Sequence, residues 1–145
     1  MLRIVIYGPD EAENHRVRAM LDDILWEAEI MPVFKEFSGE REPFLAYVKN
    51  NPYLIMLTLQ PGAAGAETVR MAKRANPDTR IVWFSDHDYA LLAFELRITF
   101  FGLFPVDQEK IESALSACCF NKRYPPWRDT LRLPRNEKTR AASQS

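Results

Sequence analysis

The chain lacks several features that mark particular classes of protein. It has only two cysteines and two histidines, so neither a disulfide-stapled fold nor a closed zinc site is expected. No apolar run approaches the roughly 20 residues that span a bilayer, and no charged-then-apolar leader opens the chain. No GxGxxG motif follows the first apolar run, so the usual phosphate cradle is not expected there. These absences predict a cytoplasmic protein with no membrane partner, metal or cofactor.

What the chain does contain suits one globular domain. Hydrophobic residues make up 47% and charged residues 27% of its 145 residues, which is close to the average for globular proteins. A chain of this size buries about two thirds of its unfolded surface. It therefore needs no disulfide or metal to fold.

Charge is divided unevenly between a body and a tail. Residues 120–145 carry seven basic and two acidic residues, so the tail is +5 and the net charge of −1 leaves −6 for residues 1–119. An acidic body does not suit nucleic-acid binding. The basic tail has Tyr124 and Trp127 among its bases, a pattern that also occurs in nucleic-acid contacts, although such tails are often only solvated. Its prolines favour an extended, flexible segment.

Five short apolar runs alternate with segments of helical period. Continuous apolar runs rich in β-branched residues are typical of strands buried on both faces. Pro32 interrupts the second run, which places that strand at a sheet edge. The third run is the most apolar and predicts the central strand. The five runs are Ile4–Tyr7, Ile30–Phe37, Tyr53–Leu59, Ile81–Phe84 and Thr99–Leu103.

Helices are predicted after each run. The first opens at Asp10, which forms a capping-box pattern with Glu13, and the last follows Asp107. The helices between them are expected over about Pro43–Asn51, Ala66–Ala75 and Tyr89–Leu96. The predicted inward residues are Val17, Leu21, Ile24, Leu25, Ala28, Phe44, Val48, Val69, Ala72, Ile111, Ala114, Leu115 and Cys118.

This alternation predicts an α/β fold of the flavodoxin-like, doubly wound type. Five parallel strands in the order 2-1-3-4-5 carry helices on both faces. Ligands of such sheets bind beyond the carboxyl ends of the strands. The candidate site residues are therefore those that follow or end the runs: Gly8, Pro9, Asp10, Thr58, Ser85 and Phe104.

Residues 1–119 resemble the receiver domain of bacterial response regulators, and most of all the receivers that precede a LytTR-type DNA-binding domain. The resemblance lies in the order and spacing of several segments across the whole domain. These segments are Tyr53–Gly62 with Gly65, Asn76–Thr79, Asp88–Leu91 with Ala93–Glu95, and Phe104–Asp107.

The resemblance implies a phosphorylation site that this chain does not reproduce. Receivers phosphorylate one aspartate with the help of an acidic Mg²⁺ site and a lysine, because phosphoryl transfer depends on positioning and charge stabilisation. Thr58, or Leu57, stands at the acceptor position, and Phe104 stands at the lysine. Gly8 and Pro9 replace the acidic pair, so that Asp10 is the one acid left there.

Ser85 and Phe101 stand at the two switch positions of receivers. Simpler structural roles are also open to them, since Ser85 can cap a turn and Phe101 can belong to the core. Asp10 is first of all a helix cap. The resemblance also leaves open whether the Phe104–Pro105 bond is cis.

These departures predict a pseudo-receiver that is not an enzyme and that binds a protein partner or a second copy of itself. The predicted contact face consists of the fourth helix, fifth strand and fifth helix, where Leu92, Phe100 and Phe104 introduce apolar groups. An inward position for Phe104, filling the emptied acidic pocket, is the alternative. Two other functions stay open: nucleic-acid contact through the tail, and a small molecule in the emptied pocket.

Overall fold

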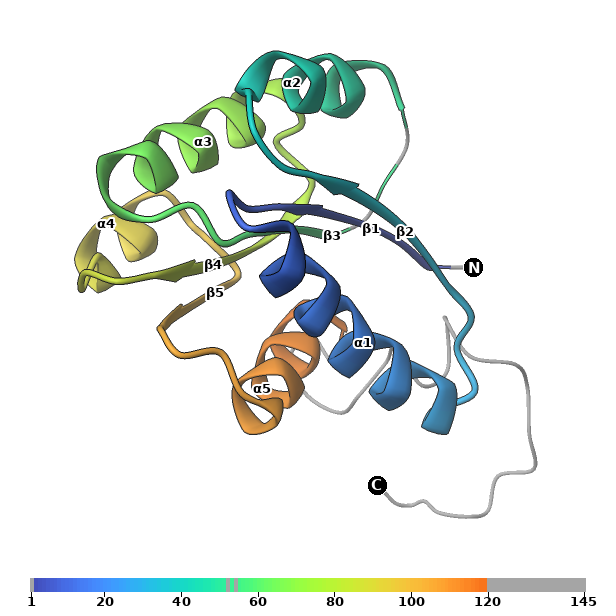
Figure 1. Cartoon of the computed structure of the whole chain (residues 1–145). Helices are drawn as coiled ribbons and strands as arrows, with labels where there is room; N and C mark the ends of the chain where they lie inside the picture. The colour runs from blue at the N-terminus through green and yellow to red at the C-terminus, as the bar shows by residue number, and fades with distance from the viewer. Residues whose placement is uncertain (1, 52, 54, 120–145) are drawn as a thin grey trace.

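The protein is described by a computed structural model that covers residues 2–51, 53 and 55–119 (Figure 1). One parallel sheet has the strand order β2-β1-β3-β4-β5, which confirms the predicted fold class. Its strands are β1 (Leu2–Tyr7), β2 (Pro32–Phe37), β3 (Ile55–Thr58), β4 (Arg80–Ser85) and β5 (Phe100–Leu103). The helices are α1 (Glu11–Glu27), α2 (Arg41–Asn50), α3 (Gly62–Ala75), α4 (Ala90–Glu95) and α5 (Gln108–Cys119).

The helices form two layers around the sheet. Figure 1 shows α1 and α5 on one face, and α2, α3 and α4 on the other. Alternating side chains of β1 supply both cores: Leu2, Ile4 and Ile6 pack with α1 and α5, whereas Val5 and Tyr7 pack with the other three helices. Both faces of the central strands are therefore buried, as their continuous apolar sequences predict.

The predicted helix stripes are confirmed. On α1, Val17, Leu21 and Leu25 are fully buried, while Ile24 and Ala28 are partly buried against the same core. The predicted inward residues of α2, α3 and α5 are all buried. Cys118 is among them, whereas the side chain of Cys119 and the tail 120–145 lie outside the described part of the chain.

Three local predictions need correction. Helix α3 begins at Gly62, four residues before the predicted Ala66, because the side chain of Asp86 accepts a hydrogen bond from the Gly62 N–H at 2.9 Å. Strand β2 begins at Pro32, because the Ile30 N–H instead bonds to a carbonyl at the end of α1. Glu13 does not complete a capping box, since its carboxylate pairs with Arg16 at 2.7 Å.

No helix within the described residues is both long enough and apolar enough to cross a membrane.

Candidate functional site

The loops that follow the strands meet at the carboxyl edge of the sheet. The Gly8 N–H donates to the Phe37 carbonyl at 3.1 Å, and the Leu59 N–H donates to the Tyr7 carbonyl at 2.9 Å. The Phe104 N–H extends the β4–β5 ladder by donating to the Ser85 carbonyl at 2.9 Å. The candidate residues after β1, β3, β4 and β5 are thereby held along one edge.

At the β1 end, the space beside Gly8 is taken by a buried amide. A Cβ atom on Gly8 would lie 2.5 Å from Asn14 Oδ1 and 2.9 Å from Leu59 Cβ. Asn14 is held there because its Nδ2 donates to the carbonyls of Gly8 and Phe37, each at 3.1 Å. Gly8 is therefore required by the close approach of Asn14, which the sequence did not single out.

Asp10 is the N-cap of α1 and is exposed. Its Oδ1 accepts a hydrogen bond from the Ala12 N–H at 3.0 Å. The neighbouring Pro9 is also exposed and offers no acid. Mg²⁺ prefers near-octahedral oxygen coordination and is usually held by one or two carboxylates together with substrate oxygens. A second carboxylate that lines the same cavity, that of Glu13, is paired with Arg16, and no cluster of three ligating side chains occurs in the described ranges. These residues do not fit the receiver's metal site.

Thr58, at the acceptor position, is completely buried. Its hydroxyl donates to the Tyr7 carbonyl at 3.1 Å and accepts from the Gln60 N–H at 3.2 Å. Leu57, the other residue considered for this position, is buried in the core. The Thr58 hydroxyl joins β3 to β1 and closes the following turn, so it is not presented to a phosphoryl donor.

Ser85, at the end of β4, binds its own loop. Its Oγ donates to Asp86 Oδ1 at 3.2 Å and accepts from the His87 N–H at 3.2 Å. The hydrogen bond from the His87 side chain, followed by the one from the Gly62 N–H, lowers the pKa of Asp86 to about 2. Asp86 was not among the predicted site residues, although its carboxylate, directly after the fourth strand, faces the start of α3.

Phe101, within β5, and Phe104, directly after it, lie in different surroundings. Phe101 packs edge-on against the buried Trp83, with ring centroids 5.1 Å apart. Phe104 is partly buried against the core below α1 and α5, and the Phe104–Pro105 bond is cis. A cation near this turn is Lys110, whose Nζ donates to the carbonyls of Leu103 at 2.7 Å and Pro105 at 2.8 Å. Two backbone carbonyls thus bind its ammonium group.

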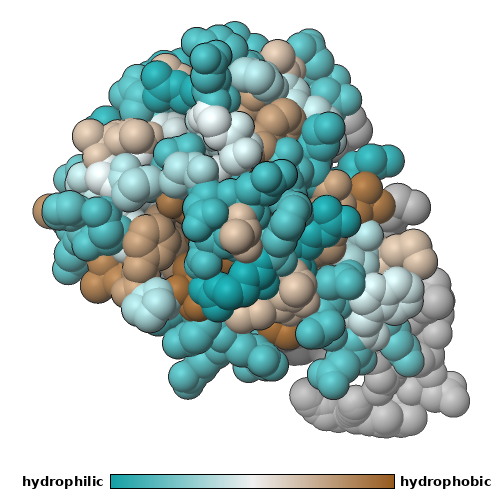
Figure 2. All heavy atoms as spheres, in the orientation of Figure 1, coloured by the Kyte–Doolittle hydropathy of each residue, from teal (hydrophilic) through white to brown (hydrophobic). Residues whose placement is uncertain are grey.

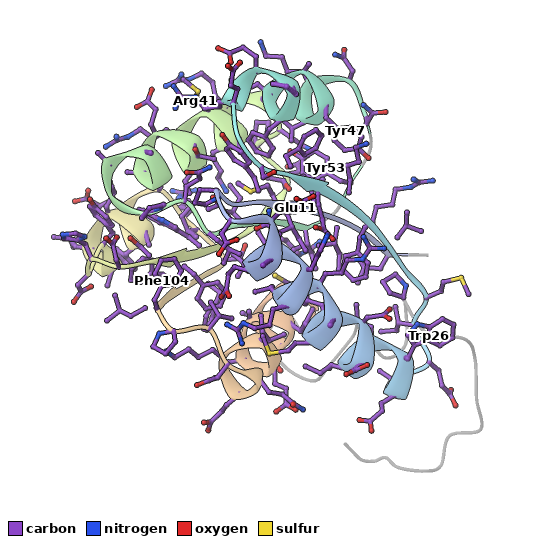
Figure 3. The ribbon with its side chains drawn as sticks, in the orientation of Figure 1. Glu11, Trp26, Arg41, Tyr47, Tyr53 and Phe104 are labelled. Atoms are coloured by element: carbon purple, nitrogen blue, oxygen red, sulfur yellow. The ribbon has the colours of Figure 1, made fainter. Side chains whose placement is uncertain are left out.

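A cavity of about 370 Å³ lies between the first turns of α1 and the loops after β3 and β5. Its one basic side chain, Arg16, is bound to Glu13 and to the Val106 carbonyl, both at 2.7 Å. Figure 3 shows Phe104 on the loop after β5, across from the start of α1 at Glu11. The cavity is lined by Pro9, Asp10, Glu13, Asn14, Arg16, Leu59, Pro61, Phe104 and Pro105.

Comparison of the backbone with solved structures places this arrangement in a known fold. A response regulator receiver domain protein from Clostridium thermocellum shares 16% identity, with 79% of this chain and 90% of that one covered at a TM-score of 0.57. The response regulator TrrA from Thermotoga maritima shares 18% identity over 79% of this chain and all of that one, at 0.55. The fold is receiver-like.

Pilus assembly proteins share the same fold. The CpaE protein from Burkholderia thailandensis covers 79% of this chain and 95% of its own length, with 14% identity and a TM-score of 0.60. No protein-family model matches the sequence, and no curated protein matches it. The similarity to known proteins therefore lies in the backbone.

The predicted contact residues of the receiver-like domain are less exposed than their neighbours. Leu92, Phe100 and Phe104 are each partly buried against a core cluster. The exposed apolar side chains of this face are Leu91 and Phe94 on α4, which are 72% and 81% exposed, and Leu103 at the end of β5, which is 43% exposed. Leu91 and Phe94 lie three residues apart and share one side of the helix.

Proposed function

We propose that the chain is a pseudo-receiver of the bacterial response-regulator type, acting in signalling or transcription control as a protein-interaction module that needs no phosphorylation. The buried, fully bonded Thr58 hydroxyl at the acceptor position carries this proposal. Around it, Asn14 fills the space beside Gly8 and Lys110 is bound to backbone carbonyls. The positions that supply the acceptor, the metal ligands and the free cation in receivers are thus all occupied differently in this chain.

The face formed by α4, β5 and α5 supports a role in binding protein. Leu91, Phe94 and Leu103 are exposed on or beside it, and Figure 2 shows apolar atoms gathered on the side of the molecule where α4 and the end of β5 lie. Exposed apolar patches commonly mark contact surfaces. A second copy of the chain is the simplest partner, because a twofold axis pairs the same patch with itself.

The test combines mass measurement with sedimentation. Incubation with acetyl phosphate and Mg²⁺ is expected to leave the mass of the intact protein unchanged, and its sedimentation profile is expected to be the same with and without these reagents. A stoichiometric aspartyl-phosphate adduct would overturn the proposal. So would self-association or partner binding that appears only after this treatment.

The cavity supports a second candidate function, the binding of a small, largely apolar molecule. Its volume of about 370 Å³ falls within the range of ligand sites in proteins. Pro61, Leu59 and Phe104 supply apolar walls. Since Arg16 and Glu13 neutralise each other, Asp10 is left to disfavour an anionic ligand. A screen of neutral and cationic aromatic fragments by thermal shift tests this function, with Phe104→Ala as the variant expected to lose any stabilisation found.

A further inference from the structure

The carboxyl-terminal end of α1 carries an exposed surface that combines apolar and acidic side chains. Trp26 and Met31 are 54% and 51% exposed, and Figure 3 shows Trp26 at the end of α1 where the chain turns toward β2. Asp23 and Glu27 are exposed beside them, and Asp22 is partly exposed. We refer to Asp22, Asp23, Trp26, Glu27 and Met31 as the α1-end surface.

The charges of the α1-end surface are unfavourable for the helix that carries them. A helix carboxyl terminus bears a partial negative charge and favours cations by about 0.3–1 kcal/mol each. The last turn of α1 contains no basic residue, and Asp22, Asp23 and Glu27 form no salt bridge with any residue that the structure describes. A cationic partner that contacts this end would relieve the repulsion.

The chain itself supplies a cationic segment that is able to reach this surface. Helices α1 and α5 cover the same face of the sheet, and both return from the carboxyl edge of the strands toward the amino edge. With about 1.5 Å per residue, α1 extends about 25 Å and α5 about 18 Å. The segment 120–145 therefore begins on the same face of the sheet as the α1 end and toward the same edge, and its 26 residues, which extend to at most about 90 Å, are long enough to reach that end.

The composition of that segment matches the α1-end surface. Residues 120–145 lie outside the described part of the chain, and their sequence carries a charge of +5. Tyr124, Trp127 and Leu131 are interspersed among the bases, so cations and apolar groups are available together. We propose that the segment 120–145 docks, within the same molecule, on the α1-end surface and covers Trp26.

Docking has a consequence for the other partners considered for the tail. The bases that neutralise Asp22, Asp23 and Glu27 are the same bases that a nucleic acid would need. A polyanion therefore competes with the α1-end surface for the tail, and added salt weakens the docked state because it screens exposed charges. Covering Trp26 and Met31 also removes exposed apolar surface.

The test uses acrylamide quenching of tryptophan fluorescence in the full chain. Trp127→Phe leaves Trp83, which is completely buried, and Trp26 as the accessible indole. In this background Asp23→Lys/Glu27→Lys is expected to raise the quenching constant about fivefold, the ratio given by about 1 kcal/mol of docking free energy. Adding Arg128→Glu/Arg132→Glu to that variant is expected to restore the low constant.

The matched control is Glu67→Lys/Glu112→Lys, which changes the net charge equally at exposed acids on α3 and α5. It is expected to leave quenching unchanged. Lysine near a helix carboxyl terminus favours the helix, so loss of α1 does not account for the expected effect, and far-ultraviolet circular dichroism checks that α1 is retained. Equal quenching in all variants would overturn the proposal, as would protection of Trp26 that disappears on dilution, since the latter means docking between molecules.

Discussion

Asn14 is the residue around which the carboxyl edge of the sheet is arranged. One amide group bridges the ends of β1 and β2, because its Nδ2 bonds to the carbonyls of Gly8 and Phe37. Its Oδ1 has no hydrogen-bond partner among the described residues and lies where a side chain at position 8 would begin. The lack of a side chain at position 8 is thus a packing requirement.

Gly8→Ala tests this requirement directly. The added methyl group meets Asn14 Oδ1 and the Leu59 side chain at distances that force one of them to move. Overpacking of this kind costs about 1–3 kcal/mol, and we expect a loss of about 2 kcal/mol in the free energy of unfolding, measured with urea. Glu67→Ala, at an exposed position on α3, is the control and should change it by less than about 0.5 kcal/mol.

Asp86 is expected to make stability depend on pH in the acid range. Its pKa is about 2 in the folded protein because His87 and the Gly62 N–H bind the carboxylate, whereas an unfolded aspartate titrates near 3.9. Between about pH 2 and pH 4, this aspartate is therefore protonated to a greater extent in the unfolded chain than in the folded protein. Stability from this group is therefore present above about pH 4 and is lost as the pH falls toward 2.

Urea unfolding of the wild type and Asp86→Asn between pH 2 and 5 measures this contribution. The difference in unfolding free energy between the two proteins should shrink as the pH falls. Glu67→Gln, which neutralises an exposed acid on α3, serves as the control. A difference that stays constant across this range would contradict the assigned pKa.

At the scale of elements, the sequence predicts those helix and strand features that depend on residues close together in the chain. The stripes of α1 and α5 and the strand order follow from apolar periodicity and from one edge proline. The start of α3 does not, because its N-cap residue, Pro61, offers no side-chain hydrogen bond. The hydrogen bond to Gly62 comes from Asp86, 24 residues later, and no local pattern contains that pairing.

Helix α5 illustrates a boundary that the sequence does specify. Asp107 Oδ1 accepts a hydrogen bond from the Lys110 N–H at 2.8 Å, and Val106 and Ile111 are buried in one core cluster. Asp107→Ala is expected to cost about 1 kcal/mol of unfolding free energy, the usual effect of losing such a cap. Urea unfolding at neutral pH measures it. Asp107→Asn keeps an acceptor and should lose less than half as much; equal losses would show that the cap is not the cause.

At the scale of the whole molecule, the candidate site was only partly predictable. The alternation of strands and helices located the carboxyl edge and the positions Thr58 and Phe104 in it. It gave no sign of Asn14, whose role depends on a helix packing over the ends of two strands. The contact face was predicted from Leu92, Phe100 and Phe104. On α4, however, the exposed large apolar residues are Leu91 and Phe94, because each residue of a helix is rotated by 100° from the one before it.

The exposed pair on α4 gives the whole-molecule prediction. If this face joins two copies, Leu91→Ser/Phe94→Ser should convert the protein to a monomer at concentrations where the wild type associates. Both side chains are largely in water in the single chain, so the unfolding free energy of the isolated subunit should change by less than about 0.5 kcal/mol per substitution. Sedimentation equilibrium over a range of concentrations measures the association.

Glu42→Ser/Lys49→Ser is the matched control, because it is also a double serine substitution, keeps the net charge and lies at exposed positions of α2, away from both proposed contact surfaces. It should associate like the wild type. Burying one phenylalanine contributes about 2 kcal/mol before the cost of association, so the loss of two such pairs across a twofold axis should weaken a dimer by more than a hundredfold. Unchanged association in Leu91→Ser/Phe94→Ser would exclude α4 from the contact, and a wild type that stays monomeric throughout would leave this face to a different protein partner.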